Sequence, residues 1–286
     1  MLGTGNQVTL GHCVSTLKSN PRLVWFPVLS TFLCLAVSAA ILIPTDAVDF
    51  LSQIKIGWGR TRIPTGAGVV CAVLFFANHF IVLFFSASLS ATSLRILRGK
   101  EATFADGVRM VIKRLPSLAL WALISGTVGW ILRGASAGFD LFERRTGTMT
   151  PLSFLSDTAW HLATMFVVPA IIVEDSSTVD ALKHSAETFK RRWGESAFGF
   201  FGFGMFFGLA AIPGPALATL GSWVGGSAGS LLLLAGVAWV VVTGVIYKTL
   251  ETIWTTALYL YARTGKAPAG FSRKQLKAAF KGEPTF

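Results

Sequence analysis

The chain of 286 residues is 52% apolar, carries only 14% charged residues and has a formal net charge of +11. Its mean hydropathy of +0.61 lies well outside the balance of an ordinary soluble domain, so the composition predicts a protein that folds in a lipid bilayer. The basic excess does not predict a nucleic-acid partner, because the charges are spread over four segments without interleaved aromatic residues.

A helix needs roughly 20 apolar residues to cross about 30 Å of hydrocarbon, and six segments are candidates for such a span. In chain order they are Leu23–Ile43, Gly66–Leu89, Leu118–Leu132, Ala159–Val173, Phe198–Leu220 and Ser230–Tyr261. The third and fourth are short or polar at one end. We expect the first to be retained rather than cleaved as a secretory signal, since its apolar run is longer than a signal core and it belongs to a repeated unit.

An amphipathic stretch with basic residues precedes three of the spans and predicts a helix that lies in the headgroup plane. The second and third of these helices are predicted to begin at capping boxes, Thr103–Asp106 and Ser177–Asp180, in which a hydroxyl and a carboxylate satisfy free backbone N–H groups. The first stretch aligns with the second at a shift of 95 residues, which places Pro21 on Pro116.

These patterns predict an all-α integral membrane protein with six transmembrane helices in three repeated units, each with an amphipathic interfacial helix before a helical hairpin. The units cover about residues 8–95, 103–174 and 177–263 within a single transmembrane domain, residues 1–263. Residues 264–286 are predicted to form a basic, water-solvated cytosolic tail. Parallel repeats of this kind commonly surround an axis along the membrane normal.

The positions of the basic residues predict an orientation. If both termini lie on one side of the membrane, most Lys and Arg residues fall on that side, and the positive-inside rule makes it the cytosol. We therefore expect a multi-pass protein of a prokaryotic inner membrane with cytosolic N- and C-termini, whose basic face meets anionic lipid headgroups. The residues predicted to contact headgroups are Lys18, Lys113, Arg114, Lys190, Arg191 and Arg192.

Four stretches carry a family resemblance. They are Phe76–Gly99, Trp160–Asp175, Ala181–Ser185 and Trp193–Ser196. Together they resemble a family of uncharacterised prokaryotic six-span membrane proteins, and the resemblance extends from about residue 10 to residue 263. It implies a membrane fold of that type, and it carries over no activity, cofactor or catalytic residue.

Lys248 and Glu251 lie three residues apart on one face of the last predicted span. A lone charge at the centre of a membrane helix costs roughly 2.5–3.5 kcal/mol on insertion scales, so a partner or a wet cavity is expected. The functional interpretation is an ion or proton pathway. The alternative is that the span ends near Tyr247 and the helix continues into the cytosol, which leaves both residues at or beyond the interface.

Asn78 and His79 lie near the middle of the second predicted span, and His161 lies near the start of the fourth. Two imidazoles could bind a metal ion or relay protons if they converged. No third ligand follows at a recognisable spacing, so we expect no metal site. Hydrogen bonds between helices are the alternative interpretation.

Gly204 and Gly208 form a GxxxG pattern in the fifth predicted span and predict close approach of two helices, within the chain or between subunits. Pro213 and Pro215 are predicted to break or kink that span near its outer end. The three cysteines have no pair or metal-ligand spacing and are expected to be buried or lipid-facing thiols.

No motif for a nucleophile, a metal centre or a cofactor is recognisable, so the sequence predicts a protein that is not an enzyme and has no cofactor. The first functional hypothesis is a channel-like or transporter-like bundle that forms a homo-oligomer. The second is a membrane-organising protein that holds anionic lipid through its basic interfacial helices and binds a protein partner on its tail. A membrane-embedded enzyme that acts on lipid headgroups is a third and weaker hypothesis.

Overall fold

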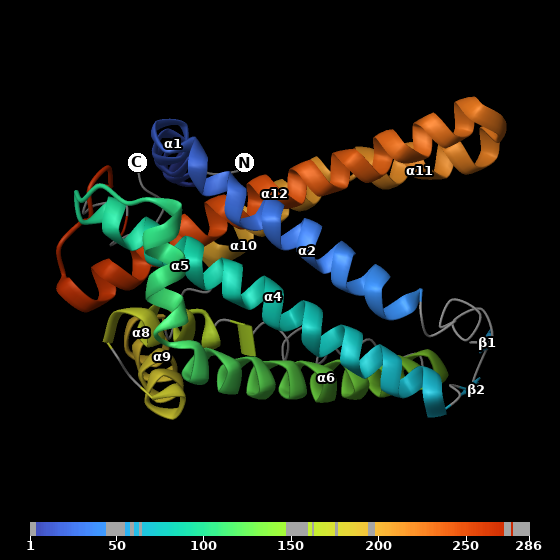
Figure 1. Cartoon of the computed structure of the whole chain (residues 1–286), viewed down its shortest axis with the longest axis horizontal. Coiled ribbons are helices and arrows are strands. Elements are labelled where there is room, and N and C mark those ends of the chain that lie inside the picture. The colour runs from blue at the N-terminus through green and yellow to red at the C-terminus, as the bar shows by residue number, and fades with distance from the viewer. Residues whose placement is uncertain are drawn as a thin grey trace.

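The structure is a computed structural model of the chain and is almost entirely helical in the part that it describes (Figure 1). The described residues are 4–43, 55–57, 60–62, 65–146, 160–161, 163–174, 177–193, 198–271 and 276. Strands β1 (Lys55–Gly57) and β2 (Arg60–Arg62) form a short antiparallel hairpin in which Ile56 pairs with Thr61. The helices are α1 (Thr4–Ser19), the 3-10 helix η1 (Pro21–Val24), α2 (Trp25–Leu42), α4 (Thr65–Leu97), α5 (Phe104–Ile112), α6 (Leu115–Thr146), α8 (Val167–Glu174), α9 (Thr178–Trp193), α10 (Phe198–Ala211), α11 (Pro213–Val224) and α12 (Gly226–Thr264).

Within the described residues, five helical segments are long and apolar enough to cross a membrane. They are Pro21–Leu42, Gly68–Leu97, Leu115–Leu132, Gly204–Val224 and Gly226–Thr264. Large apolar side chains are exposed along them, such as Phe32 on α2 and Trp223, which is 87% exposed, on α11. Exposed apolar side chains of this kind are better solvated by lipid than by water. Length, composition and surface together indicate a multi-pass membrane protein.

The fourth predicted span, Ala159–Val173, is not found among these five segments. In its described part the helix is interrupted by a turn at Met165 and Phe166, and the α-helix that follows, α8, has only eight residues. Pro169 has no backbone N–H to donate to the Met165 carbonyl, which explains the interruption. Eight helical residues extend about 12 Å, too short a distance to cross the hydrocarbon layer alone.

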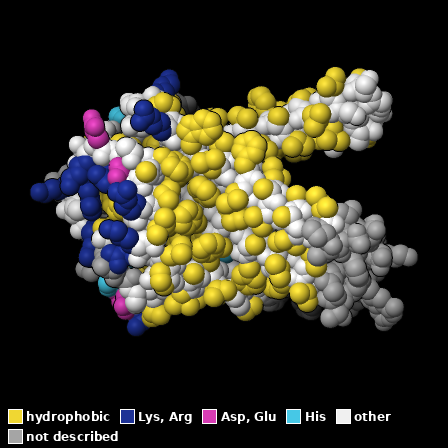
Figure 2. All heavy atoms as spheres, in the orientation of Figure 1, with side chains coloured by type: hydrophobic (Ala, Val, Ile, Leu, Met, Phe, Trp, Pro, Cys, Tyr) yellow, Lys and Arg dark blue, Asp and Glu magenta, His cyan; other side chains and the backbone are white. Residues whose placement is uncertain are grey.

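The long helices connect two ends of the molecule (Figure 1). One end holds α1, α5, α8, α9 and the C-terminal part of α12, and the other holds the turn between α11 and α12 and the β-hairpin. α6 runs from the first end to the second, whereas α8, which follows it, lies back at the first. Figure 2 shows the Lys and Arg side chains gathered at the first end, which we call the basic end, and apolar side chains over the middle of the molecule.

α11 and the first half of α12 form a hairpin that projects away from the other helices (Figure 1). Its two helices approach closely at glycines: a Cβ placed on Gly221 would lie 2.6 Å from the Gly229 carbonyl oxygen, and one on Gly236 would lie 2.5 Å from that of Gly214. The turn passes through Gly225 and Gly226, whose φ angles of 66° and 61° favour glycine. The hairpin is therefore held by small residues that let two backbones meet.

The predicted contact at Gly204 and Gly208 is not made within the described part of the chain. No atom there lies within 4 Å of the position that a Cβ would take on either residue. The close approaches lie instead in the α11–α12 hairpin. The predicted break of this span is confirmed, because α10 ends at Ala211 and Pro213 begins α11, where a missing N–H costs no helical hydrogen bond.

The largest apolar cluster fills the basic end and includes Phe166, Ile171, Ile253 and Leu258. Two residues of the predicted water-solvated tail belong to it: Phe271 is 7% exposed and Leu276 is fully buried. The Phe271 ring lies 6.0 Å from that of Trp254 and 5.9 Å from that of His12. The tail is thus not solvated throughout, because part of it packs on α1 and α12.

The capping box of α5 is confirmed, and at the start of α9 the cap by the Ser177 hydroxyl is confirmed. At the start of α5, the Asp106 carboxylate accepts hydrogen bonds from the Thr103 N–H (2.9 Å) and hydroxyl (2.8 Å), and the Asp106 N–H donates to Thr103 Oγ1. At the start of α9, the Asp180 N–H donates to Ser177 Oγ, whose hydroxyl donates to Asp180 Oδ2 at 2.6 Å. At α5 the hydroxyl and the carboxylate each satisfy a backbone N–H, whereas at α9 the hydroxyl satisfies the Asp180 N–H and the carboxylate accepts from that hydroxyl.

Candidate functional site

A pocket of about 430 Å³ lies between α4, α6, α12 and the segment that precedes α8. Four of the five polar residues singled out in the sequence line it: His79, His161, Lys248 and Glu251. The side chains of Trp121 and Trp160 form part of its wall, with ring centroids 6.3 Å apart. Residues from far apart in the chain thus converge on one cavity, which we call the polar pocket.

Glu251 is the most buried ionisable residue of the pocket, with a side chain only 9% exposed. Its Oε2 accepts a hydrogen bond from Lys248 Nζ at 2.8 Å, and its Oε1 accepts one from the Tyr247 hydroxyl at 3.1 Å. His161 Nε2 lies 3.7 Å from the same Oε1. A buried carboxylate needs such partners, because desolvation of a single charge in an apolar bundle is costly.

The spacing along α12 explains two of these contacts. Lys248 and Tyr247 precede Glu251 by three and four residues, which places all three side chains on one face of the helix. Only His161 comes from another segment. The Lys248 side chain stays 40% exposed, so it can offer further N–H donors to the cavity.

His79 reaches the pocket from α4. Its Nε2 lies 2.8 Å from Ser125 Oγ on α6, and the Ser125 hydroxyl donates to the Trp121 carbonyl at 2.8 Å. The histidine tautomer decides which of His79 Nε2 and Ser125 Oγ donates in their hydrogen bond. The His79 ring also stacks on Phe75, with centroids 5.7 Å apart.

Asn78 points the other way. Its Nδ2 donates to Ser38 Oγ on α2 at 3.0 Å, and it does not line the polar pocket. Adjacent residues on a helix point about 100° apart, so Asn78 and His79 serve two different interfaces. Both residues make hydrogen bonds to a neighbouring helix, and His79 also lines the polar pocket.

Hydroxyl groups line much of the remaining wall, and sequence reasoning missed them. Ser90 on α4 and Thr256 on α12 hydrogen-bond to each other at 2.9 Å, and Ser86, Thr252 and Thr255 line the cavity beside them. Beyond the Ser90 and Thr256 pair, toward the basic end, the helices enter the apolar cluster. The recurrence of Ser and Thr at helical spacing within two apolar helices was the signal that could have found this wall.

The residues predicted to contact headgroups lie near the ends of the short helices. Lys18 is exposed in the last turn of α1, and Lys113 is exposed at the C-cap of α5, directly before Arg114. The side chains of Lys190, Arg191 and Arg192, on α9, lie outside the described residues. Among the described residues, no group of three or more His, Cys, Asp or Glu side chains is arranged to hold a metal ion.

Comparison with known proteins adds a family and no activity. No curated protein and no solved structure matches the chain significantly. Residues 66–271, from α4 to Phe271, match a family described as "Family of unknown function (DUF6159)". The match includes every residue that lines the polar pocket and confirms the resemblance to an uncharacterised family. The chain belongs to this family of unknown function, DUF6159.

Proposed function

We propose that the chain is a membrane transport protein, channel-like or transporter-like, and that the polar pocket is its binding or conduction site. The supporting observation is the buried Glu251, which is paired with Lys248, Tyr247 and His161 inside a cavity between helices apolar enough to span a membrane. Ionisable groups in such helices raise the free energy of membrane insertion, and their usual role is to bind or conduct ions, protons or polar solutes. The proposal gives the chain no catalytic role and no cofactor.

We also propose six crossings, with both termini in the cytosol of a prokaryotic inner membrane. Five crossings would leave α1 and the end of α12 on opposite sides of the bilayer, although both lie at the basic end (Figure 1). Because α6 leads away from that end and α8 lies back at it, the positions of these two helices agree with an even number of crossings. The positive-inside rule then assigns the basic end to the cytosol.

Two further features of the proposal concern repetition and assembly. A helix of at most 16 residues precedes an apolar helix three times, in the pairs α1 and α2, α5 and α6, and α9 and α10, which supports three repeated units. No described atom lies within 4 Å of a Cβ placed on Gly204 or Gly208, which supports a homo-oligomer in which these glycines contact a second copy.

Proton flux into liposomes tests the role of the pocket. The purified protein is reconstituted in vesicles that contain pyranine, and a potassium diffusion potential set by valinomycin drives proton entry. We expect wild-type protein to acidify the lumen faster than empty vesicles, and Glu251→Gln to lower that rate at least tenfold by removing the charge that organises the pocket. Glu187→Gln, the same change at an exposed position of α9, is the matched control and keeps the wild-type rate.

A double variant distinguishes the loss of a proton path from a folding defect. The double variant Lys248→Met with Glu251→Leu removes both charges together and leaves no uncompensated charge in the bundle. We expect it to fold and to lose proton flux. Wild-type flux in Glu251→Gln at equal incorporation, or no flux above empty vesicles for wild-type protein, would reject the pocket as a proton path.

The gathering of basic side chains at one end favours a second candidate function, a protein that organises anionic lipid (Figure 2). Lys18 and Lys113 extend into the surroundings there, and each basic group near an anionic surface contributes about 1 kcal/mol. Replacing Lys18, Lys113 and Arg114 by Gln should then reduce the phosphatidylglycerol that co-purifies with the protein, as measured by mass spectrometry. Retention equal to wild type would exclude this function.

A further inference from the structure

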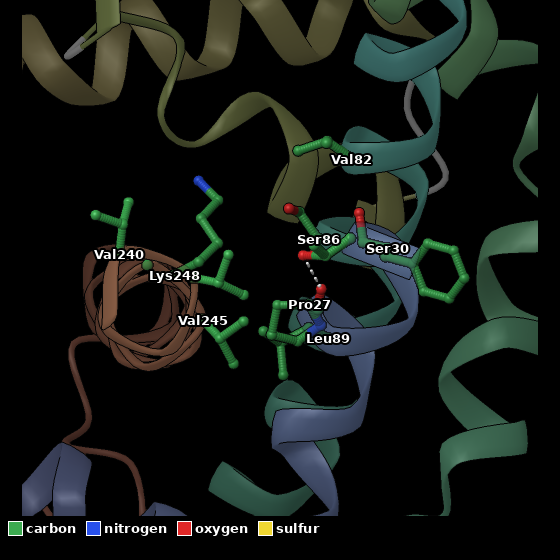
Figure 3. A pocket seen from close by; sticks show the side chains of 12 residues that line it. Pro27, Ser30, Val82, Ser86, Leu89, Val240, Val245 and Lys248 are labelled. Atoms are coloured by element: carbon green, nitrogen blue, oxygen red, sulfur yellow. Dashed lines mark hydrogen bonds between the residues drawn. The ribbon is translucent and has the colours of Figure 1, made fainter. Parts of the chain in front are cut away.

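A second cavity, of about 220 Å³, lies where α12 meets α2 and α4 (Figure 3). Its walls are mainly aliphatic and aromatic, with Pro27 from α2, Leu89 from α4, and Val240 and Val245 from α12 among them. We call it the apolar cleft. It differs from the polar pocket in chemistry, although the two cavities are neighbours.

Three residues line both cavities: Val82, Ser86 and Lys248. They therefore form the boundary between the apolar cleft and the polar pocket. In Figure 3 the Lys248 side chain extends outward from α12, and Val245 lies one helical turn away on the cleft side. A ligand that occupied both cavities would pass the Lys248 ammonium group.

The cleft adjoins the membrane-facing surface. Val82, Val240 and Val241 line it and are each about 41–42% exposed, and the α11–α12 hairpin stands apart from the other helices beyond this point (Figure 2). In a bilayer, acyl chains would occupy that space. A molecule could thus enter the cleft sideways from the lipid, and its chain would remain in an apolar environment.

The groups at the boundary determine which kind of polar head group such a molecule can have. Both carboxylate oxygens of Glu251 already accept contacts from the protein, and the side chain is 9% exposed, whereas Lys248 is 40% exposed. An ammonium group has three N–H donors and Glu251 engages one, so the boundary offers donors and a positive charge. Acceptor-only anions such as carboxylate and phosphate complement that arrangement.

We propose that the two cavities together bind a single-chain anionic amphiphile, with the chain in the apolar cleft and the carboxylate or phosphate head beside Lys248 at the entrance to the polar pocket. This inference rests on the proposed function, because it names the substrate class of the same pocket. It explains why a charged, hydroxyl-lined cavity and an apolar cavity share one lysine.

Gly244 allows the cleft to be filled without disturbing the fold. It lines the cleft, and a Cβ placed on it has no atom of the described residues within 4 Å. Gly244→Leu should therefore occupy the space of the chain. Gly11→Leu is the matched control, since Gly11 on α1 has equally open surroundings and lines neither cavity. Both changes replace a helical glycine by a better helix former.

The binding of radiolabelled oleate to the detergent-purified protein, measured by scintillation proximity, tests the proposal. We expect saturable binding to wild type and Gly11→Leu, and at least tenfold weaker binding to Gly244→Leu. Lys248→Met should weaken oleate at least tenfold and leave oleyl alcohol unchanged, and Lys248→Arg should retain oleate. Competition by lysophosphatidic acid distinguishes a preference for phosphate over carboxylate.

Several outcomes would overturn the inference. One is the absence of saturable oleate binding to wild type, and another is equal oleate binding to wild type and Gly244→Leu. A third is a change of oligomer size in Gly244→Leu without a change in oleate binding, because that result would assign the cleft to a second copy of the chain. Proton flux, measured separately, distinguishes this failure from failure of the proposed function. Loss of flux in Glu251→Gln without oleate binding in wild type rejects the amphiphile and keeps the transport role.

Discussion

At the scale of single residues, the ionisable groups are held first by neighbours on their own helix. Glu251 receives Tyr247 and Lys248 from within α12, and His161 alone joins from another segment. Contacts between side chains three or four residues apart on one helix form as the helix itself forms. The charge of Glu251 can therefore be compensated within α12 alone, without the packing of other helices around it.

Cys13 provides a prediction at this scale. It is fully buried in α1, and burial raises the pKa of its thiol to about 12. Because the thiolate is the reactive form, N-ethylmaleimide at pH 7.5 should modify Cys13 at least tenfold more slowly in the folded protein than after denaturation in dodecyl sulfate. Peptide mass spectrometry measures both rates for the same peptide. Equal rates would show that α1 does not pack as described.

The candidate site shows what sequence could predict about residues. A charged pair three residues apart in an apolar run is visible in the sequence, and so is a histidine in a span. The direction in which each residue faces depends on how the helix is rotated against its neighbours, which is why Asn78 and His79 separate. A single serine or threonine carries little signal, because hydroxyls are common in membrane helices and bond to their own backbone. Their recurrence four residues apart, as at Ser86 and Ser90 or Thr252 and Thr256, is the signal that marks the pocket wall.

At the scale of elements, the capping box of α5 is sensitive to pH. The pKa of the Asp106 carboxyl is lowered, first by the backbone hydrogen bond from Thr103 and then by the Thr103 hydroxyl, with smaller contributions from Arg95 and Arg109. A lowered pKa means that this contribution to stability is complete above the carboxyl's ordinary range near pH 4 and is lost as the pH falls through the folded-state value.

We therefore expect backbone amides of α5 to exchange hydrogen faster as the pH is lowered from 5 toward 3, after correction for intrinsic exchange rates. Asp106→Asn should abolish most of that pH dependence. Glu101→Gln, which removes an exposed carboxylate just before the helix, is the control and should behave as wild type. Hydrogen exchange followed by mass spectrometry measures this, and an unchanged pH profile in Asp106→Asn would contradict the assignment.

The α11–α12 hairpin gives a second prediction about an element. A Cβ on Gly221 would lie 2.6 Å from the Gly229 carbonyl oxygen and 2.8 Å from the Leu233 nitrogen, and neither backbone atom can move without parting the helices. Gly221→Ala should therefore destabilise the protein by about 1–3 kcal/mol, as overpacking does. Gly11→Ala, where a Cβ meets no described atom within 4 Å, is the matched control. Thermal unfolding in detergent that gives equal midpoints would contradict the close approach.

Elements defined by local chemistry could be predicted from the sequence, and elements defined by distant partners could not. The capping boxes and the break at Pro213 depend on residues within one helical turn, and they were predicted. The burial of Phe271 and Leu276 depends on contacts with α1 and α12, and their basic neighbours in the sequence suggest a solvated tail instead. A GxxxG pattern likewise does not reveal which glycines meet a partner.

At the scale of the whole molecule, the buried apolar residues are gathered toward one end. The basic end holds the large apolar cluster, whereas the opposite end separates into the α11–α12 hairpin and the remaining helices (Figure 2). Both cavities lie where the packed and separated parts meet, bounded by α4 and α12. A site at such a junction can exchange ligand with the lipid while the cluster at the basic end stays closed, which suits a protein that takes up an amphiphile from one side.

The orientation of the molecule in the membrane can be tested by labelling cysteines at its two ends. If the basic end is cytosolic, residues at that end are accessible only from the cytosol, and the turn between α11 and α12 is accessible only from outside, because the helices between them cross the hydrocarbon layer. Lys18→Cys and Ser222→Cys, made in a background without the three native cysteines, place one thiol at each end, both at exposed positions. A membrane-impermeant maleimide should label Ser222→Cys in intact spheroplasts and Lys18→Cys only in inverted vesicles. Lys113→Cys, also at the basic end, should follow Lys18→Cys. Labelling of Lys18→Cys and Ser222→Cys from the same side would contradict the assignment of the two ends to opposite faces of the membrane. Labelling of Lys18→Cys in spheroplasts and of Ser222→Cys only in inverted vesicles would invert the orientation and place the opening of the site in the cytosolic leaflet.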